Sequence, residues 1–257
     1  MSKLRRAAKK LKKERGVRGK ITLILRWFRK RLGHFFYDEL LRGERRRRSL
    51  YDRLLLDKDF AQQFIEDNAP MMKTDGLALD AGCGIGTWPA AFSTSGKTIV
   101  AVDIAPNDYW HRVTHASFLV ADVTTMPFRD SIFHLCLCLT VLEETRDDKL
   151  VLQEIRRVLV SKGRFLLKVP NKGNLKTRAT GKMLYAKHLR EYEKNEITLL
   201  LEHSGFTIKS IRIAGFYSPI FTRFVNTLIS RHTWLSLGEL LPEKYRGVIT
   251  VICEKAT

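Results

Sequence analysis

The predicted fold of this chain is decided by residues 77–87, which read Leu-Ala-Leu-Asp-Ala-Gly-Cys-Gly-Ile-Gly-Thr. A short apolar run ends in Asp80, and glycines follow at every second position from Gly82 to Gly86. Residues 88–92 are compatible with a helix. Glycine permits positive φ and a close approach between backbone and ligand, and a helix start offers free N–H donors. The stretch therefore predicts a strand, a glycine turn and a helix start beside a ligand.

The glycine spacing differs from that of dinucleotide sites, which read G-x-G-x-x-G. Here the glycines read G-x-G-x-G, and Asp80 stands two residues before the first of them. A carboxylate at that position would repel a pyrophosphate and would suit a cationic ligand. A glycine loop alone is a weak indication, because many such loops only turn the chain.

Two further acidic residues strengthen the hypothesis of a ligand site. The apolar run at residues 98–102 ends in Asp103, and the run at residues 118–121 ends in Asp122. Parallel strands would bring the three carboxylates to one edge of a sheet, which is where open α/β sheets bind their ligands. Each Asp alone could simply cap a helix or a turn. Three in step, the first beside the glycine loop, favour a ligand site.

With these motifs the chain resembles the class I S-adenosylmethionine-dependent methyltransferases, especially their small-molecule, type 11-like branch, over roughly Asp75 to Cys253. The resemblance implies an α/β fold with a Rossmann-like, doubly wound, mostly parallel seven-stranded sheet. The last strand would be antiparallel, and a helical extension would precede the domain. The cofactor implied is S-adenosyl-L-methionine.

The resemblance also assigns roles to residues. Asp80 and the glycine loop would hold the methionine end of the cofactor, Asp103 would accept hydrogen bonds from the ribose hydroxyls, and Asp122 would meet the adenine beside the Val123 amide. The cofactor residues predicted in this way are Asp80, Ala81, Gly82, Cys83, Gly84, Gly86, Asp103, Ile104, Asp122, Val123, Leu139 and Thr140.

Later segments resemble the family in order, including a helix-like stretch with Glu154-Ile-Arg-Arg-Val-Leu before a fifth strand. The chain also departs from the family pattern at three places. The family often has Asp where this chain has His134, His where it has Glu144, and two glycines where it has Lys162-Gly163. None of these positions belongs to the predicted cofactor set, but the change at Glu144 puts any inherited general base in doubt.

The sulfonium methyl of such a cofactor is already activated, so the predicted reaction requires no metal. The protein must hold a nucleophile in line with the methyl group and exclude water. A base helps if the nucleophile is a hydroxyl, a phenol or an acidic carbon. Candidate bases near the expected site are Glu143, Glu144, His188 and Tyr192. Each could equally be a surface or packing residue.

The four cysteines do not have the spacing of a metal site. Cys136 and Cys138 would share one face of a strand, and reduced, buried thiols of a cytosolic protein are the favoured interpretation. No run reaches the roughly 18 apolar residues of a membrane span. The N-terminus lacks a signal-peptide core, so the expected location is the cytoplasm, with membrane association left open.

Positive charge is concentrated at the N-terminus. Residues 1–50 hold 19 Lys and Arg against 4 Asp and Glu, whereas the other residues contribute only +4 to the formal net charge of +19. The predicted organisation is a basic extension at 1–48 followed by a methyltransferase domain at 49–257. An apolar helical insert is expected at about 216–242. It could cover the sheet edge, form a lipophilic wall for substrate entry or make a second membrane contact.

The extension is predicted to contain an amphipathic helix with a basic polar face. Its apolar stripe comprises Ile21, Ile24, Leu25, Phe28, Leu32, Phe35 and Phe36. Three interpretations stay open: the stripe packs on the domain, it lies in an anionic membrane surface, or the extension holds nucleic acid. The run from Arg45 to Arg48 could serve either anionic partner.

The leading hypothesis is a peripheral-membrane methyltransferase acting on a small apolar, lipid-like or quinone-like substrate. No Asn/Asp-Pro-Pro-aromatic motif and no Pro-Cys follows the expected fourth strand, which argues against two routes of base methylation. The alternative is a methyltransferase of RNA or other nucleic acid that uses the basic extension. A third hypothesis is a cofactor-binding scaffold without catalysis. The acceptor atom and the oligomeric state stay open.

Overall fold

A computed structural model describes residues 76–92, 99–183, 187–215 and 239–257. All of them belong to one compact unit of the chain, Asp57–Thr257. The predicted basic extension at 1–48, with its amphipathic helix, lies outside the described residues, as does most of the predicted insert at about 216–242.

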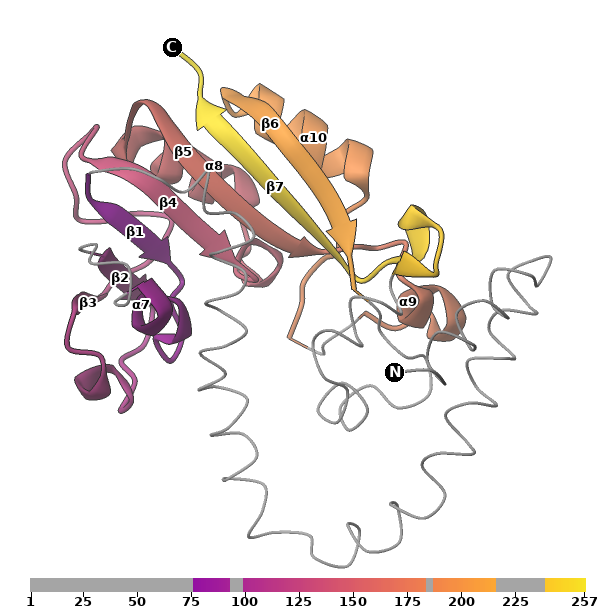
Figure 1. Cartoon of the computed structure of the whole chain (residues 1–257), viewed down its shortest axis with the longest axis horizontal. Helices are drawn as coiled ribbons and strands as arrows, with labels where there is room; N and C mark the ends of the chain where they lie inside the picture. Colours follow the sequence, from indigo (N-terminus) through magenta and orange to yellow (C-terminus); the bar gives the residue numbers. More distant parts are fainter. Residues whose placement is uncertain (1–75, 93–98, 184–186, 216–238) are drawn as a thin grey trace, which may run out of the picture. The chain divides into compact units, whose positions relative to one another are not determined.

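Seven strands form one sheet in the order β3-β2-β1-β4-β5-β7-β6 (Figure 1). Their bounds are Ala78–Ala81 (β1), Ile99–Asp103 (β2), Ala116–Val120 (β3), Phe133–Leu139 (β4), Leu159–Pro170 (β5), Phe206–Ala214 (β6) and Val248–Lys255 (β7). The pairs from β3 through β5 are parallel, and β7 is antiparallel to both β5 and β6. The predicted mostly parallel sheet with an antiparallel last strand is confirmed, and that strand lies between β5 and β6.

The described helices are α7 (Thr87–Phe92), α8 (Asp148–Val158), α9 (Leu175–Thr180) and α10 (Lys194–His203). Short 3-10 turns are η2 (Trp110–Arg112), η3 (Leu142–Glu144) and η4 (Glu243–Tyr245). Local sequence accounts for the start of α8, because the Asp147 side chain accepts hydrogen bonds from the amides of Lys149 and Leu150. In α10, Glu193 and Glu196 form a reciprocal capping box.

Alternation along the strands separates two apolar layers. In β4, Cys136 and Cys138 belong to the layer that contains the buried face of α8 and α10, while Leu135 and Leu137 belong to the opposite layer, against which Trp88 of α7 packs. Both faces of the sheet are therefore apolar, as expected for parallel strands covered by helices. The predicted placement of the two thiols on one strand face is confirmed.

All four cysteines are free and buried. No group of three or more His, Cys, Asp or Glu suited to a metal ion occurs within the described residues. In that same part of the chain, every helix is too short or too polar to cross a membrane. Lys162, which replaces a frequent family glycine, has a φ of 58°, a left-handed conformation that glycine adopts more easily.

Candidate cofactor site

Asp80 lies inside the sheet, in β1, and its side chain is fully buried. Neither carboxylate oxygen has a hydrogen-bond partner within the described residues. Burial, and to a lesser degree the nearby Asp103, raises the pKa of Asp80 to about 8. An unpaired buried carboxyl is costly to a fold, so its presence calls for a ligand that compensates it. A cationic group is the natural partner.

The loop after β1 depends on its glycines. Gly82, Gly84 and Gly86 have φ values of 83°, 53° and 90°. The amides of Gly82 and Cys83 both donate to the Val102 carbonyl, at 2.8 and 2.9 Å, which bends the chain over the end of β2. A Cβ on Gly82 would overlap the Val141 side chain, whereas a Cβ on Gly84 would meet no atom of the described residues within 4 Å. Gly84 therefore faces open space, where a ligand can approach the backbone.

Asp103 is tied to this loop. Its Oδ2 accepts a hydrogen bond from the Gly84 amide at 2.7 Å. On the other side, the indole Nε1 of Trp110 donates to the Gly84 carbonyl at 2.8 Å, and the Trp110 ring stacks on Phe118 with centroids 4.9 Å apart. The sequence did not predict a role for Trp110. Its contact with Gly84 depends on how residues 104–109 fold, and no local motif indicates that contact.

The three predicted carboxylates do not lie level with one another. Ala81 pairs with Val102, so Asp103 lies two residues further toward the carboxyl end than Asp80. Asp103 in turn pairs with Val120, which puts Asp122 two residues further again. This stagger explains why Asp80 is buried, Asp103 half-buried and Asp122 exposed. A ligand along this edge meets carboxylates at three depths.

Asp122 also caps a turn, the alternative role that its sequence context allows. Its Oδ1 accepts from the amide and the hydroxyl of Thr124, at 2.8 and 2.7 Å. The amide of Thr125 donates to the Asp122 carbonyl. These bonds hold the exposed carboxylate in a fixed turn, and the neighbouring Val123 is buried.

The remaining predicted cofactor residues lie along the same edge. Ala81, Cys83 and Leu139 are buried, and Ile104 is 72% exposed. Thr140 follows β4 with a φ of 62°, and its hydroxyl donates to the Leu139 carbonyl. Burial, with Asp80 and Asp103 nearby, raises the pKa of the Cys83 thiol far above its ordinary value, so Cys83 acts as a neutral packing group.

Glu143 and His188 are the two predicted bases that the structure brings together. Glu143 is fully buried in η3, immediately after β4, and His188 Nε2 lies 3.8 Å from its Oε1. The Leu189 amide donates to the Glu143 carbonyl at 2.8 Å, which fixes the two segments side by side. Burial, with a smaller contribution from Glu144, raises the pKa of Glu143 to about 8, against the lowering effects of its own backbone amide and of Lys168 and Lys187. Neither carboxylate oxygen of Glu143 accepts a hydrogen bond within the described residues.

The other two predicted bases are engaged elsewhere. Glu144 forms an ion pair of 2.6 Å with Lys187. The Tyr192 hydroxyl donates to Asp148 at 3.0 Å, and Arg190 pairs with the same carboxylate oxygen at 2.7 Å. Burial, with Asp148 beside it, raises the pKa of Tyr192 far above its ordinary value. The contacts of Tyr192 are those of a structural residue that ties the chain to the start of α8.

Comparison with known proteins assigns this arrangement to a family. Residues 79–167 match the family described as "Methyltransferase domain". An uncharacterised protein of Methanocaldococcus jannaschii is 30% identical over 172 residues, which span 65% of this chain and 68% of that protein. The chain belongs to the class I S-adenosylmethionine-dependent methyltransferases. It is therefore a methyltransferase, and its cofactor is S-adenosylmethionine.

Two further similar proteins have named activities. A malonyl-[acyl-carrier protein] O-methyltransferase of Erwinia pyrifoliae is 31% identical over 101 residues, 38% of each chain. The 1,6-didemethyltoxoflavin-N1-methyltransferase of Burkholderia thailandensis, solved with its substrate and S-adenosylhomocysteine, has a TM-score of 0.54 at 16% identity. That match covers 95% of this chain and 92% of the other, and it supports the shared methyltransferase fold.

The residues of this methyltransferase fit the cofactor. The unpaired Asp80 carboxyl suits the ammonium of the methionine end, and the open space at Gly84 leaves room beside the backbone. Asp103 and Asp122, further out along the same edge, suit the hydroxyl and amino donors of a nucleoside. When bound, S-adenosylmethionine supplies a methyl group on a sulfonium centre. The individual residue assignments stay predictions.

Proposed function

We propose that this methyltransferase acts on a small apolar, lipid-like acceptor at an anionic membrane surface. The observation that carries the proposal is the segregation of charge: residues 1–50 hold most of the excess positive charge, and the rest of the chain is nearly balanced. A basic amphipathic segment favours anionic headgroups. The nearly balanced remainder offers little support for a broad phosphate-binding groove.

Two ionisable side chains in the segments beside the end of β4 favour transfer to a protic group. Of the four predicted catalytic bases, Glu143 and His188 lie beside each other, with Nε2 of His188 3.8 Å from Oε1 of Glu143, close to the end of β4. When bound, S-adenosylmethionine would supply the methyl group to a hydroxyl oxygen of the acceptor. The hydroxyl proton passes to the Glu143–His188 pair and is then released to water. The products are a methyl ether and S-adenosylhomocysteine.

A labelling experiment tests the acceptor class. The full-length protein is incubated with methyl-labelled cofactor and with separated lipid, RNA, protein and small-molecule extracts. Label in the lipid or apolar small-molecule fraction supports the proposal. Label in the RNA fraction alone would overturn it in favour of a nucleic-acid methyltransferase.

Co-sedimentation with vesicles tests the membrane claim separately. The full chain should bind anionic vesicles at low salt and bind neutral vesicles weakly. A variant with Arg45 to Arg48 replaced by Gln should lose much of this binding. Absence of binding to anionic vesicles at low salt contradicts membrane attachment, whatever the acceptor.

Nucleic-acid methylation is the second candidate, because the same basic segment would hold phosphates. It predicts tight RNA binding that falls steeply with salt and weakens in the same Arg45 to Arg48 variant. A scaffold without catalysis would bind the cofactor and label no fraction at all.

A further inference from the structure

The loop between β3 and β4, residues 121–132, leaves the same sheet edge that carries the cofactor site. It begins with Asp122 and Val123, and its first turn is closed by the bonds of Thr124 and Thr125 to Asp122. Val123 and Met126 then enter the apolar core. The position of the loop at Met126 therefore sets how Asp122 and Val123 face the edge.

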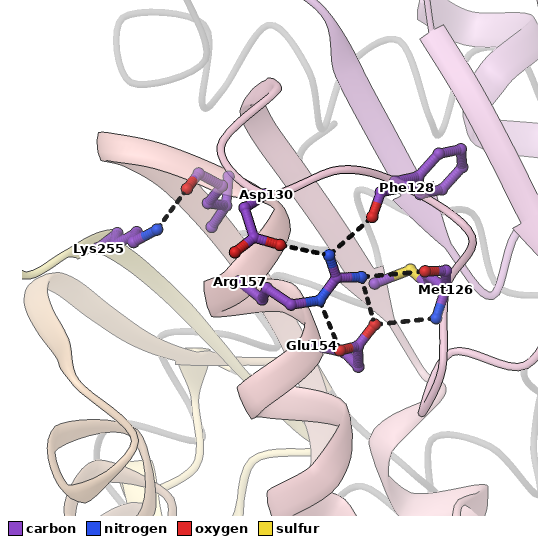
Figure 2. A network of polar contacts seen from close by, with 7 residues as sticks. Met126, Phe128, Asp130, Glu154, Arg157 and Lys255 are labelled. Carbon is purple, nitrogen blue, oxygen red and sulfur yellow. Dashed lines mark hydrogen bonds and ion pairs between the residues drawn. The ribbon is translucent and has the colours of Figure 1, made fainter.

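Two side chains of α8 hold Met126 by its backbone (Figure 2). Glu154 Oε2 accepts a hydrogen bond from the Met126 amide at 2.9 Å. Arg157 Nη2 donates to the Met126 carbonyl at 3.0 Å. Side chains of α8, which packs against the sheet, thus bind both the backbone N–H and the backbone carbonyl of Met126.

Arg157 uses the whole of its guanidinium in this arrangement. Nε and Nη2 donate to the two oxygens of Glu154, each at 2.8 Å, and Nη1 donates at 2.7 Å to both the Phe128 carbonyl and Asp130. A planar fork of donors is required to reach all of these acceptors, which a lysine lacks. Arg157 lowers the pKa of Glu154, so the pair stays charged at neutral pH. We call this pair the Glu154–Arg157 clamp.

The end of the loop does not need the clamp. The amides of Ser131 and Ile132 donate to the carbonyls of Arg157 and Val158, at 3.0 and 2.9 Å, so backbone bonds already join the loop to the end of α8. A purely structural role would be served by these bonds and by the buried Val123 and Met126. What the clamp adds is a fixed position for Met126, four residues after Asp122.

We infer that Glu154 and Arg157 are positioning residues for the adenosine half of the cofactor. They act through the Met126 backbone on Asp122 and Val123, without touching the ligand. The inference rests on the cofactor site and not on the proposed acceptor or on membrane attachment.

Calorimetry with two nucleoside ligands tests this inference. Arg157→Met should weaken the binding of S-adenosylhomocysteine and of 5′-methylthioadenosine, which lacks the amino-acid group. The two affinities should fall by a similar factor of roughly 5- to 50-fold. Amide exchange at Met126 should become faster without ligand. Asp130→Asn, which changes a residue whose side chain is 74% exposed, should shift affinity by less than about twofold.

Arg190→Met is the matched control. The Arg190 side chain is 30% exposed, as is that of Arg157, and its 2.7 Å ion pair with Asp148 joins the other end of α8. It should lower stability while leaving nucleoside affinity unchanged. Equal affinity in Arg157→Met and the parent, or an equal loss in Arg190→Met, would overturn the inference. If Arg157→Met does not fold, the same affinity measurement on Glu154→Gln decides between these outcomes. That variant keeps an oxygen for the Met126 amide and removes the negative charge that pairs with Arg157.

Discussion

At the scale of single residues, two buried carboxyls distinguish this site. Asp80 and Glu143 both lack hydrogen-bond partners within the described part of the chain, and both have a pKa raised to about 8 by burial. The native state then holds protons that the unfolded state releases above pH 4. Stability of the cofactor-free protein should therefore fall as pH rises from about 4 to 8.

Asp80→Asn should reveal the charge partner of the cofactor. An ammonium group beside Asp80 favours its ionised form, so ligand binding near pH 7 should release up to about one proton in the parent and fewer in the variant. Affinity for S-adenosylhomocysteine should fall roughly 10- to 150-fold. Calorimetry in buffers of different ionisation enthalpy measures both the number of protons released and the ligand affinity. Proton release that is unchanged in the variant would exclude Asp80 as the titrating group.

Glu143→Gln should separate proton transfer from cofactor binding. The ionised carboxylate is the proton acceptor, so the parent rate should rise with pH toward about pH 8. In the variant this rise of the rate with pH should disappear, and kcat should fall by about 100-fold or more. Its cofactor affinity should stay within about threefold of the parent value. Glu144→Gln, which breaks the ion pair with Lys187 and leaves the Glu143 carboxyl in place, is the control for the loss of kcat. A parent-like pH profile in Glu143→Gln would argue against the proton-transfer role.

At the scale of elements, the glycine loop must keep its own conformation and must also leave room for the ligand. Substitutions at two of its glycines can separate these two requirements. Gly82→Ala places a methyl group in the Val141 side chain at a positive φ, so the loop cannot keep its conformation. The methyl group of Gly84→Ala meets no atom within 4 Å in the part of the chain that the structure describes, and the substitution costs about 1–2 kcal/mol of backbone strain.

Gly84→Ala should therefore stay folded and yet bind S-adenosylhomocysteine at least about tenfold more weakly, because its methyl group occupies the space left for the ligand. Gly82→Ala should lose both stability and binding. Thermal unfolding and calorimetry measure the two effects. Parent-like affinity in Gly84→Ala would show that the ligand does not approach the backbone there.

At the scale of the whole molecule, we expect cofactor binding and the proposed membrane attachment to depend on different parts of the chain. On the cofactor edge Asp80 is buried and Asp103 half-buried, so salt screens their charges weakly, whereas residues 1–50 carry most of the excess charge of the chain. Raising salt from about 0.05 to 0.5 M should release the protein from anionic vesicles and change S-adenosylhomocysteine affinity by less than about threefold. Parallel losses in both measurements would contradict this separation.

The sequence alone determined what local chain chemistry dictates. Apolar runs closing on Asp80 and Asp103 marked β1 and β2, and glycines at alternate positions marked a turn that needs positive φ. Together with Asp122, those features carried the resemblance that implied the fold, the family and the cofactor. They also offered Glu143 and His188 among four candidate bases, without a means to choose.

Tertiary structure decided everything that depends on which distant segments meet. Strand register staggered the three carboxylates and buried Asp80. Packing of residues 187–189 beside η3 paired His188 with Glu143 and tied Tyr192 to Asp148 instead. The Trp110 contact with Gly84 and the Glu154–Arg157 clamp likewise join residues 26 to 31 positions apart. Burial and hydrogen bonding are properties of the assembled neighbourhood, and a linear pattern of residue types does not encode them position by position.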